Sequence, residues 1–188
     1  MNTALDAVSR TEQAALRRPP ALEWRRLCEA DEPAFTAALG AIFEHAPWVA
    51  RAAWAQRPFD SLAALHAAML GAVRAAPLAQ QIAFLRGHPE LAGKEAQAGT
   101  MTDHSTHEQA GLNALSRAEV DALRALNTAY AQRHGFPFIV NVLGHSKSQI
   151  FDGLRERIGH DTPGEIDMAL QQIAAITWRR LTALLGGA

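Results

Sequence analysis

Apolar residues recur every three or four positions along most of this chain, which is the spacing that places them on one face of an α-helix. Prolines and glycines interrupt the pattern at intervals, so it predicts several separate helices. Four predicted apolar faces are well defined: Phe35, Leu39, Ile42 and Phe43; Leu62, Leu65, Met69 and Val73; Val120, Leu123, Leu126 and Tyr130; and Ile166, Leu170, Ile173, Leu181 and Leu184.

Capping residues mark where these helices are expected to begin. Asp31, just before Pro33, is one predicted N-cap, and Asp60 or Ser61 is another. Four Ser or Thr residues are each followed three positions later by Glu or Gln, which is the form of a capping box. These pairs are Ser105 with Glu108, Ser116 with Glu119, Ser146 with Gln149, and Thr162 with Glu165.

Residues 136–143 form the one strand-like run of the sequence. No partner strand is evident, so we expect a buried extended segment rather than a sheet. Gly135 is expected to end the helix that starts at Ser116, and Pro77 to start a helix over about 78–86. The sequence therefore predicts an all-α, single-domain bundle of roughly eight helices with one short extended segment. Residues 1–21 are expected to be a leader, and residues 22–188 the helical domain.

Composition narrows the class of protein further. The chain has 188 residues, 48% of them hydrophobic, and a formal net charge of −1, with no run of Lys or Arg, so no nucleic-acid partner is expected. Its single cysteine, Cys28, excludes an internal disulfide and a CxxC motif. No apolar run reaches the length of a membrane span and the start has no signal-type apolar stretch, so we expect a cytoplasmic protein without a membrane partner.

Candidate chemistry gathers in two short stretches. Gly87 and Pro89 flank His88, and a residue before proline is biased toward extended backbone, so the imidazole is expected to leave the preceding helix. The predicted box at Ser105 would place Glu108 at a helix N-terminus, where backbone N–H groups favour anions. A titratable ring, a carboxylate and such a helix end suit acid–base chemistry on a small acidic substrate.

Each of these residues also has a purely structural interpretation. A histidine in a turn is often a surface or capping group, and a capping-box residue such as Ser105 or Glu108 has a sufficient role in the cap itself. His88, His104 and His107 with Glu108 suggest a zinc site, but His104 precedes the predicted cap, which weakens the spacing argument.

Five stretches in this order resemble the family of 2-oxo-4-hydroxy-4-carboxy-5-ureidoimidazoline (OHCU) decarboxylases of urate breakdown. They are FEHAPWVA at 43–50, RPF at 57–59, HPELAGK at 88–94, STHEQ at 105–109 followed by Gly111 and Leu112, and GFPFI at 135–139 after Leu126, Asn127 and Tyr130. The resemblance runs from about Leu22 to Leu185. It implies conversion of OHCU to (S)-allantoin and CO2 without a cofactor or a metal, and a homodimer.

The resemblance also implies the residues of the site. It assigns His88 as the catalytic acid/base, with Glu108 as a second catalytic residue. The substrate-contacting residues that it implies are Pro89, Ser105, Thr106, His107, Gln109, Ile139, Val140, Asn141, Val142 and Leu143.

Leu143 departs from the family pattern, because many relatives carry Arg or Lys there. Arg86, His145 and Lys147 are the candidates to supply the missing cation. Two alternatives remain open at this point: a non-enzymatic helical interaction protein that keeps the fold, and a lyase or hydrolase that acts on another ureido acid.

Overall fold

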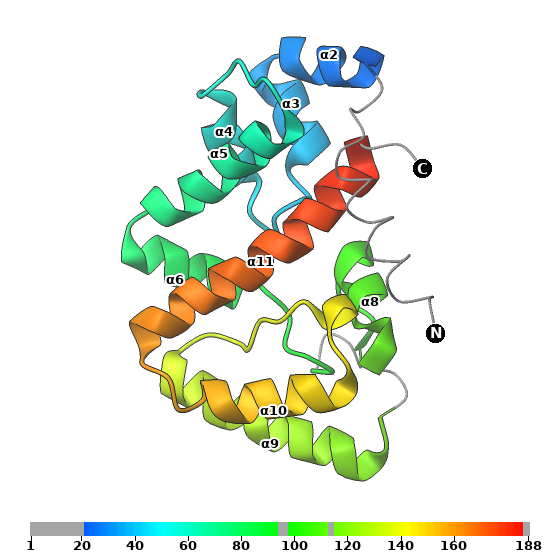
Figure 1. The fold of residues 1–188 in the computed structure, drawn as a ribbon, viewed down its shortest axis with the longest axis vertical. Helices are drawn as coiled ribbons and strands as arrows, with labels where there is room; N and C mark the ends of the chain where they lie inside the picture. The colour runs from blue at the N-terminus through cyan, green and yellow to red at the C-terminus, as the bar shows by residue number, and fades with distance from the viewer. Residues whose placement is uncertain (1–20, 94–97, 113–114, 186–188) are drawn as a thin grey trace, which may run out of the picture. The chain divides into compact units, whose positions relative to one another are not determined.

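The computed structural model describes residues 21–93, 98–112 and 115–185, and these residues form helices and loops with no β-strand among them (Figure 1). The predicted all-α class is confirmed. The strand-like run is mostly buried and forms no strand among the described residues, as expected. It is not extended to its end, however: irregular backbone runs from Phe136 to Asn141, and Val142–Gly144 is a single 3₁₀ turn, η2, in which Leu143 is exposed.

The described chain falls into two compact units by its contacts. Of the described residues, unit 1 holds 21–75 and 177–185, and unit 2 holds those between 76 and 176. The helices of unit 1 are α2 (Ala21–Glu29), α3 (Glu32–Leu39), α4 (Pro47–Trp54) and α5 (Leu62–Ala75). Those of unit 2 are α6 (Leu78–Arg86), α8 (Asp103–Gln109), η1 (Ala110–Leu112), α9 (Arg117–His134), η2 and α10 (Lys147–Arg157). The last helix, α11 (Thr162–Leu185), contributes to both units.

In unit 1, α3 packs against α2 and α4, and α4 packs against α5. The predicted apolar faces supply its core, since Phe35, Leu39, Leu65, Met69 and Val73 are all fully buried. The expected caps form as well. The Asp31 carboxylate accepts a hydrogen bond from the Ala34 N–H at 2.9 Å, and the Ser61 hydroxyl accepts one from the Ala64 N–H at 3.1 Å.

Two buried polar pairs join the end of α11 to the rest of unit 1. The Arg180 guanidinium donates to the Glu44 carboxylate at 2.9 Å and to the Ile42 carbonyl oxygen at 3.3 Å. His66 Nε2 lies 2.9 Å from the Thr177 hydroxyl. Spacing along the chain gave no indication of either pair, because their members are more than a hundred residues apart.

Burial of His66 makes the stability of the fold dependent on pH. Burial lowers the pKa of His66 from 6.5 to about 4. The unfolded chain therefore binds more protons than the folded one between these values, and the stabilisation that is complete above pH 6.5 is lost as the pH falls toward 4. We expect the free energy of unfolding to be about 2 kcal/mol lower at pH 5 than at pH 8 from this group alone.

Urea denaturation followed by circular dichroism at the two pH values measures this loss. The control is His66→Gln, which keeps an amide beside the Thr177 hydroxyl but does not titrate. The variant should lose about 2 kcal/mol less than the wild type between pH 8 and pH 5. Equal losses in the two proteins would show that His66 is not the acid-sensitive group.

In unit 2, α9 and α10 contact each other (Figure 1). Both begin with the predicted capping boxes. The side chains of Ser116 and Ser146 accept hydrogen bonds from the backbone N–H of Glu119 and Gln149, and the side chains of Glu119 and Gln149 accept from the backbone N–H of the two serines. Gly135 ends α9 in the left-handed region at φ 81°, where glycine carries no Cβ penalty. The helix predicted to start after Pro77 is α6.

Two predicted caps are wrong. Thr102, not Ser105, caps α8, since its hydroxyl accepts from the Ser105 N–H at 3.3 Å. Glu108 therefore lies near the C-terminal end of α8 and not at its N-terminus. At α11 the Asp161 carboxylate accepts from the Gly164 N–H at 2.7 Å, so Asp161 and not Thr162 holds the capping position.

Some expectations concern features that the described residues do not test. The predicted leader, 1–21, falls almost wholly outside them, as does part of the loop expected after Lys94. The leader boundary, the homodimer and the cytoplasmic location stay predictions. Among the described residues no single helix is both long and apolar enough to cross a membrane, and α5 and α6 reach the required length and composition only as a bent pair.

Candidate active site

His88 lies directly after the end of α6, where the chain leaves the helix. Its backbone N–H donates to the Leu85 carbonyl oxygen at 3.2 Å, and its Nδ1 lies 3.2 Å from the Phe84 carbonyl oxygen. Because a carbonyl oxygen only accepts, Nδ1 carries the proton in this bond, and Nε2 is the basic nitrogen of the neutral ring. The ring also packs edge-on against the Phe84 ring, with 5.0 Å between centroids. The end of α6 thus sets both the orientation and the tautomer of His88.

Two helices hold the turn that follows His88. From α9, the Asn127 amide donates to the Glu90 carboxylate at 3.1 Å and to the Leu91 carbonyl oxygen at 3.0 Å. From α8, the Gln109 side-chain oxygen accepts from the Ala92 N–H at 3.1 Å. Ala92 has a positive φ of 47°, which costs a non-glycine residue roughly 1 kcal/mol or more. The Gln109 bond helps to hold this strained turn in place.

A cavity of about 790 Å³ opens beside His88 within unit 2. His88, Arg86 and Glu90 line it from the end of α6 and the turn, and Arg124 lines it from α9. The volume suits a small ring compound. Among the described residues, none from α8 and none of 139–143 belongs to its lining, which ends at Pro137.

The two stretches predicted to contact substrate are brought together, since α8 and η2 contact each other. On α8, Ser105 and Gln109 are buried, Glu108 is half-buried, and Thr106 and His107 are exposed. Before and within η2, Ile139, Val140 and Val142 are buried, Asn141 is half-buried, and Leu143 is 43% exposed; Pro89, beside His88, is half-buried. Gln109 joins α8 to the His88 turn, so three chain segments of the predicted site meet.

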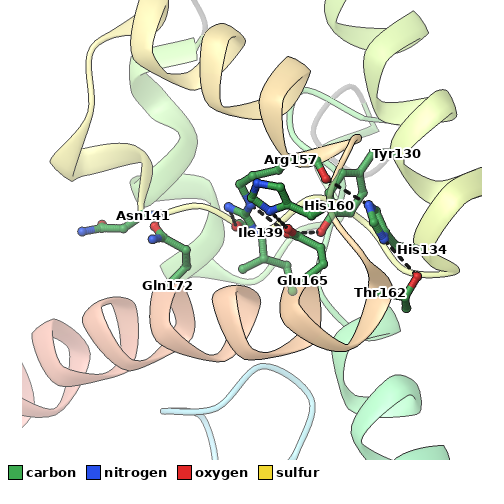
Figure 2. Close-up of polar contacts among 9 residues, drawn as sticks. All are labelled: Tyr130, His134, Ile139, Asn141, Arg157, His160, Thr162, Glu165 and Gln172. Carbon is green, nitrogen blue, oxygen red and sulfur yellow. Dashed lines mark hydrogen bonds and ion pairs between the residues drawn. The ribbon is translucent and has the colours of Figure 1, made fainter.

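Residues that the sequence did not single out hold the segment 139–141 from its other side. The Arg157 guanidinium donates to the Ile139 carbonyl oxygen at 2.9 Å, and the Gln172 side-chain oxygen accepts from the Asn141 N–H at 3.0 Å (Figure 2). Arg157 is itself paired with Glu165, which had been predicted to be a capping residue. No local signal reveals these contacts, because each joins residues that lie on different elements.

Of Arg86, His145 and Lys147, the three candidates to supply the cation, only Arg86 is among the described residues that line the His88 cavity. Its Nε donates to the Gly135 carbonyl oxygen at 2.6 Å, which fixes the guanidinium at the cavity wall. Lys147 instead pairs with Glu119, with 2.5 Å between Nζ and the carboxylate oxygen. His145 is exposed, with Nδ1 2.9 Å from the Asn141 carbonyl oxygen.

The histidines that suggested zinc do not form a metal site in the described part of the chain. His104 and His107 both lie within α8, three residues apart and exposed. No group of three or more His, Cys, Asp or Glu side chains among the described residues is arranged to hold a metal ion.

Comparison with known proteins defines the class to which this fold and site belong. A family model described as OHCU decarboxylase matches residues 28–182. The chain belongs to the OHCU decarboxylase family.

Individual relatives and structures agree with this assignment. The chain is 37% identical to the 2-oxo-4-hydroxy-4-carboxy-5-ureidoimidazoline decarboxylase of Halalkalicoccus jeotgali, over 84% of this chain and 89% of that protein. It is 36% identical to the protein of the same name from Mus musculus, over 81% and 86%. A crystal structure of (S)-allantoin synthase matches with a TM-score of 0.70 and 27% identity, over 86% of this chain and 54% of that one. A structure of OHCU decarboxylase in the presence of (S)-allantoin shares the fold, with a TM-score of 0.59 and 17% identity, over 82% and 98%.

Proposed function

We propose that this protein is a carboxy-lyase that converts OHCU to (S)-allantoin and CO2 in urate degradation. Membership of the OHCU decarboxylase family, with relatives of that name matched over most of their length, carries the proposal. The location of His88 in a cavity of suitable size supports it independently.

The chemistry of the substrate explains how a protein without a cofactor can catalyse this reaction. When the carboxylate leaves as CO2, the electron pair of the broken C–C bond moves into the adjacent ring C=N bond. The ring nitrogen takes up a proton, the carbon that carries the ureido group takes up another, and the neighbouring hydroxyl gives one up to become the ring carbonyl. The substrate is its own electron sink, so the protein has to bind the ring, exclude water and move protons.

His88 is suited to the proton transfers. Its Nδ1–H is engaged by the Phe84 carbonyl oxygen, so Nε2 is the atom that takes the hydroxyl proton or returns one to the intermediate. Glu108 is proposed to orient the substrate from α8. Delivery of the proton from one face accounts for a single enantiomer of the product.

The segment before η2 is suited to binding the ring. Val140 is buried, yet among the described residues no hydrogen bond engages its backbone N–H or C=O. Buried backbone groups are nearly always paired, so this donor and acceptor on one residue suit an amide edge of a ligand. Contact of the substrate ring with this segment would explain why the backbone groups of Val140 are buried and yet have no hydrogen bond among the described residues.

An assay with freshly generated OHCU tests the proposed function. Formation of (S)-allantoin is followed by circular dichroism and corrected for spontaneous decay of OHCU. We expect rapid formation of one enantiomer at catalytic protein concentration. Decay at the spontaneous rate to a racemic product would reject the proposal in favour of a non-enzymatic protein or a different ureido-acid substrate.

Replacing Arg86 should weaken substrate binding more than it slows the chemical step. We expect Arg86→Gln to raise the KM for OHCU roughly tenfold, the size of a lost charge-assisted hydrogen bond, with kcat changed by less than about threefold. The reason is that Arg86 lines the cavity, and we propose that it supplies there the cation that is missing at Leu143.

Lys147→Gln removes the same charge from a side chain that pairs with Glu119, and it serves as the matched control. Steady-state kinetics of both variants measure the difference. If Lys147→Gln raised KM as much as Arg86→Gln, the effect would come from net charge, and Arg86 would have no specific role.

A further inference from the structure

Two hydrogen bonds hold the segment 139–141, one at each of two positions that are two residues apart. Arg157 Nη1 donates to the Ile139 carbonyl oxygen, and Gln172 Oε1 accepts from the Asn141 N–H, at 2.9 Å and 3.0 Å (Figure 2). One contact comes from α10 and the other from α11. Together they fix a carbonyl and an amide that bracket Val140, the residue whose own backbone groups are unengaged among the described residues.

The Arg157 side chain is held rigidly enough to serve this purpose. It donates from Nε at 2.7 Å, and also from Nη2, to Oε1 of Glu165, which is wholly buried. Its guanidinium carbon lies 4.5 Å from the centre of the Phe138 ring. Tyr130 OH donates to the same Glu165 oxygen at 2.5 Å, and His160 Nδ1 lies 3.1 Å from the other (Figure 2). With two of its three nitrogens bound to Glu165, Nη1 points in a fixed direction.

A buried ion pair is not needed for stability alone. Removing two charges from water is costly, and well-packed apolar residues of similar volume often stabilise a protein as well or better. The guanidinium supplies what an apolar side chain cannot, namely a planar set of donors that reaches the carboxylate and the Ile139 carbonyl at once. The pair therefore serves to fix the position of backbone.

Gln172 completes this arrangement from α11. It lies seven residues after Glu165, which is two turns further along the same face of the helix. The one described hydrogen bond of its side chain is the bond that it accepts from the Asn141 N–H. The neighbouring Gln171 is exposed, so the helix carries an internal comparison one position away.

We propose that Gln172 and Arg157 are positioning residues that hold the backbone of 139–141 in the geometry that binds the substrate ring. The proposal rests on the proposed function, because that function makes this segment a substrate contact. Neither side chain takes part in proton transfer, so loosening the segment acts on binding and leaves the chemistry at His88 unchanged. KM should therefore rise while kcat is preserved.

Gln172→Leu tests the proposal, with Gln171→Leu as the matched control and Gln172→Glu as the conservative variant that keeps an acceptor for the Asn141 N–H. Two quantities are measured on the full chain: KM and kcat for OHCU, and the hydrogen-exchange rate of the Asn141 amide by NMR. Gln172→Leu should raise KM about tenfold with kcat within about twofold, and speed Asn141 exchange about tenfold or more. Gln171→Leu and Gln172→Glu should stay close to the wild type in both.

The exchange measurement needs no turnover, so it separates this proposal from the proposed function. If the wild type fails to turn over OHCU, the proposed function is wrong, and selective acceleration of Asn141 exchange in Gln172→Leu still supports the positioning contact. Unchanged Asn141 exchange in Gln172→Leu would overturn the proposal. So would a fall in kcat with KM unaltered, or equal effects of Gln171→Leu and Gln172→Leu.

Discussion

Replacement of His88 by asparagine is expected to slow OHCU decarboxylation by a factor on the order of 10² to 10⁴, the usual contribution of a general acid–base group. Asparagine can still donate a hydrogen bond near the Phe84 carbonyl oxygen, but it cannot exchange a proton as Nε2 does. Substrate binding should weaken less than turnover, because the turn, α8 and the segment 139–141 remain. Single-turnover decay of OHCU, corrected for the spontaneous rate, measures the effect.

The fold of this variant should be retained. His88 is half-buried and follows a helix end, so it contributes little to the core. A far-ultraviolet circular dichroism spectrum and an unaltered urea midpoint are the controls. A folded His88→Asn protein with nearly wild-type turnover would remove His88 from the mechanism, and the acid/base would have to be sought elsewhere among the groups that line the cavity.

Glu165→Leu is expected to lower the free energy of unfolding by about 3 to 5 kcal/mol, because it leaves the buried Arg157 charge without its partner. It also removes the acceptor of the Tyr130 hydroxyl. A loss of this size is a large fraction of the stability of a typical domain. Urea denaturation monitored by circular dichroism gives the value directly.

Two further variants show whether the unpaired charge causes the loss. Asp167→Leu removes an exposed carboxylate two residues along α11 and should change stability by no more than about 0.5 kcal/mol. Adding Arg157→Met to Glu165→Leu removes the stranded charge and should restore most of the stability. If the free energy of unfolding of Glu165→Leu were within about 1 kcal/mol of the wild-type value, the ion pair would not contribute strongly to the stability of the fold.

Local sequence signals predicted the helices well, because each is defined by neighbours in the chain. Asp31, Ser116, Ser146 and Gly135 all act at the helix ends where their residue types favour them. The two errors have the same cause. In each case two residues that favour the N-cap position lie close together: Thr102 and Ser105 are three positions apart, and Asp161 and Thr162 are adjacent. The sequence pattern alone therefore does not determine which of the two caps the helix.

The site was only partly predictable, for a related reason. The histidine turn and the stretches on α8 and η2 are visible as motifs, and the structure brings these segments together. Glu165, by contrast, fits a capping pattern but is wholly buried, since its partners Tyr130 and Arg157 come from two other helices. In the sequence, Gln172 is not distinguishable from other polar residues of the helix. Its role becomes visible only from its hydrogen bond with the Asn141 N–H. Such contacts depend on how distant elements pack, which spacing along one element does not encode.

The membership of α11 in both units has a consequence for the order in which the protein is made. Unit 2 is a continuous stretch, 76–176, and all of its residues are available once Ile176 has been synthesised. Unit 1 must wait, since Glu44 gains Arg180 only 136 residues later and His66 gains Thr177 only 111 residues later. At ribosomal rates this delay is on the order of 10 s. A nascent chain that stops at Ile176 therefore carries every segment of the candidate site, while Glu44 and His66 still lack the partners that allow them to be buried.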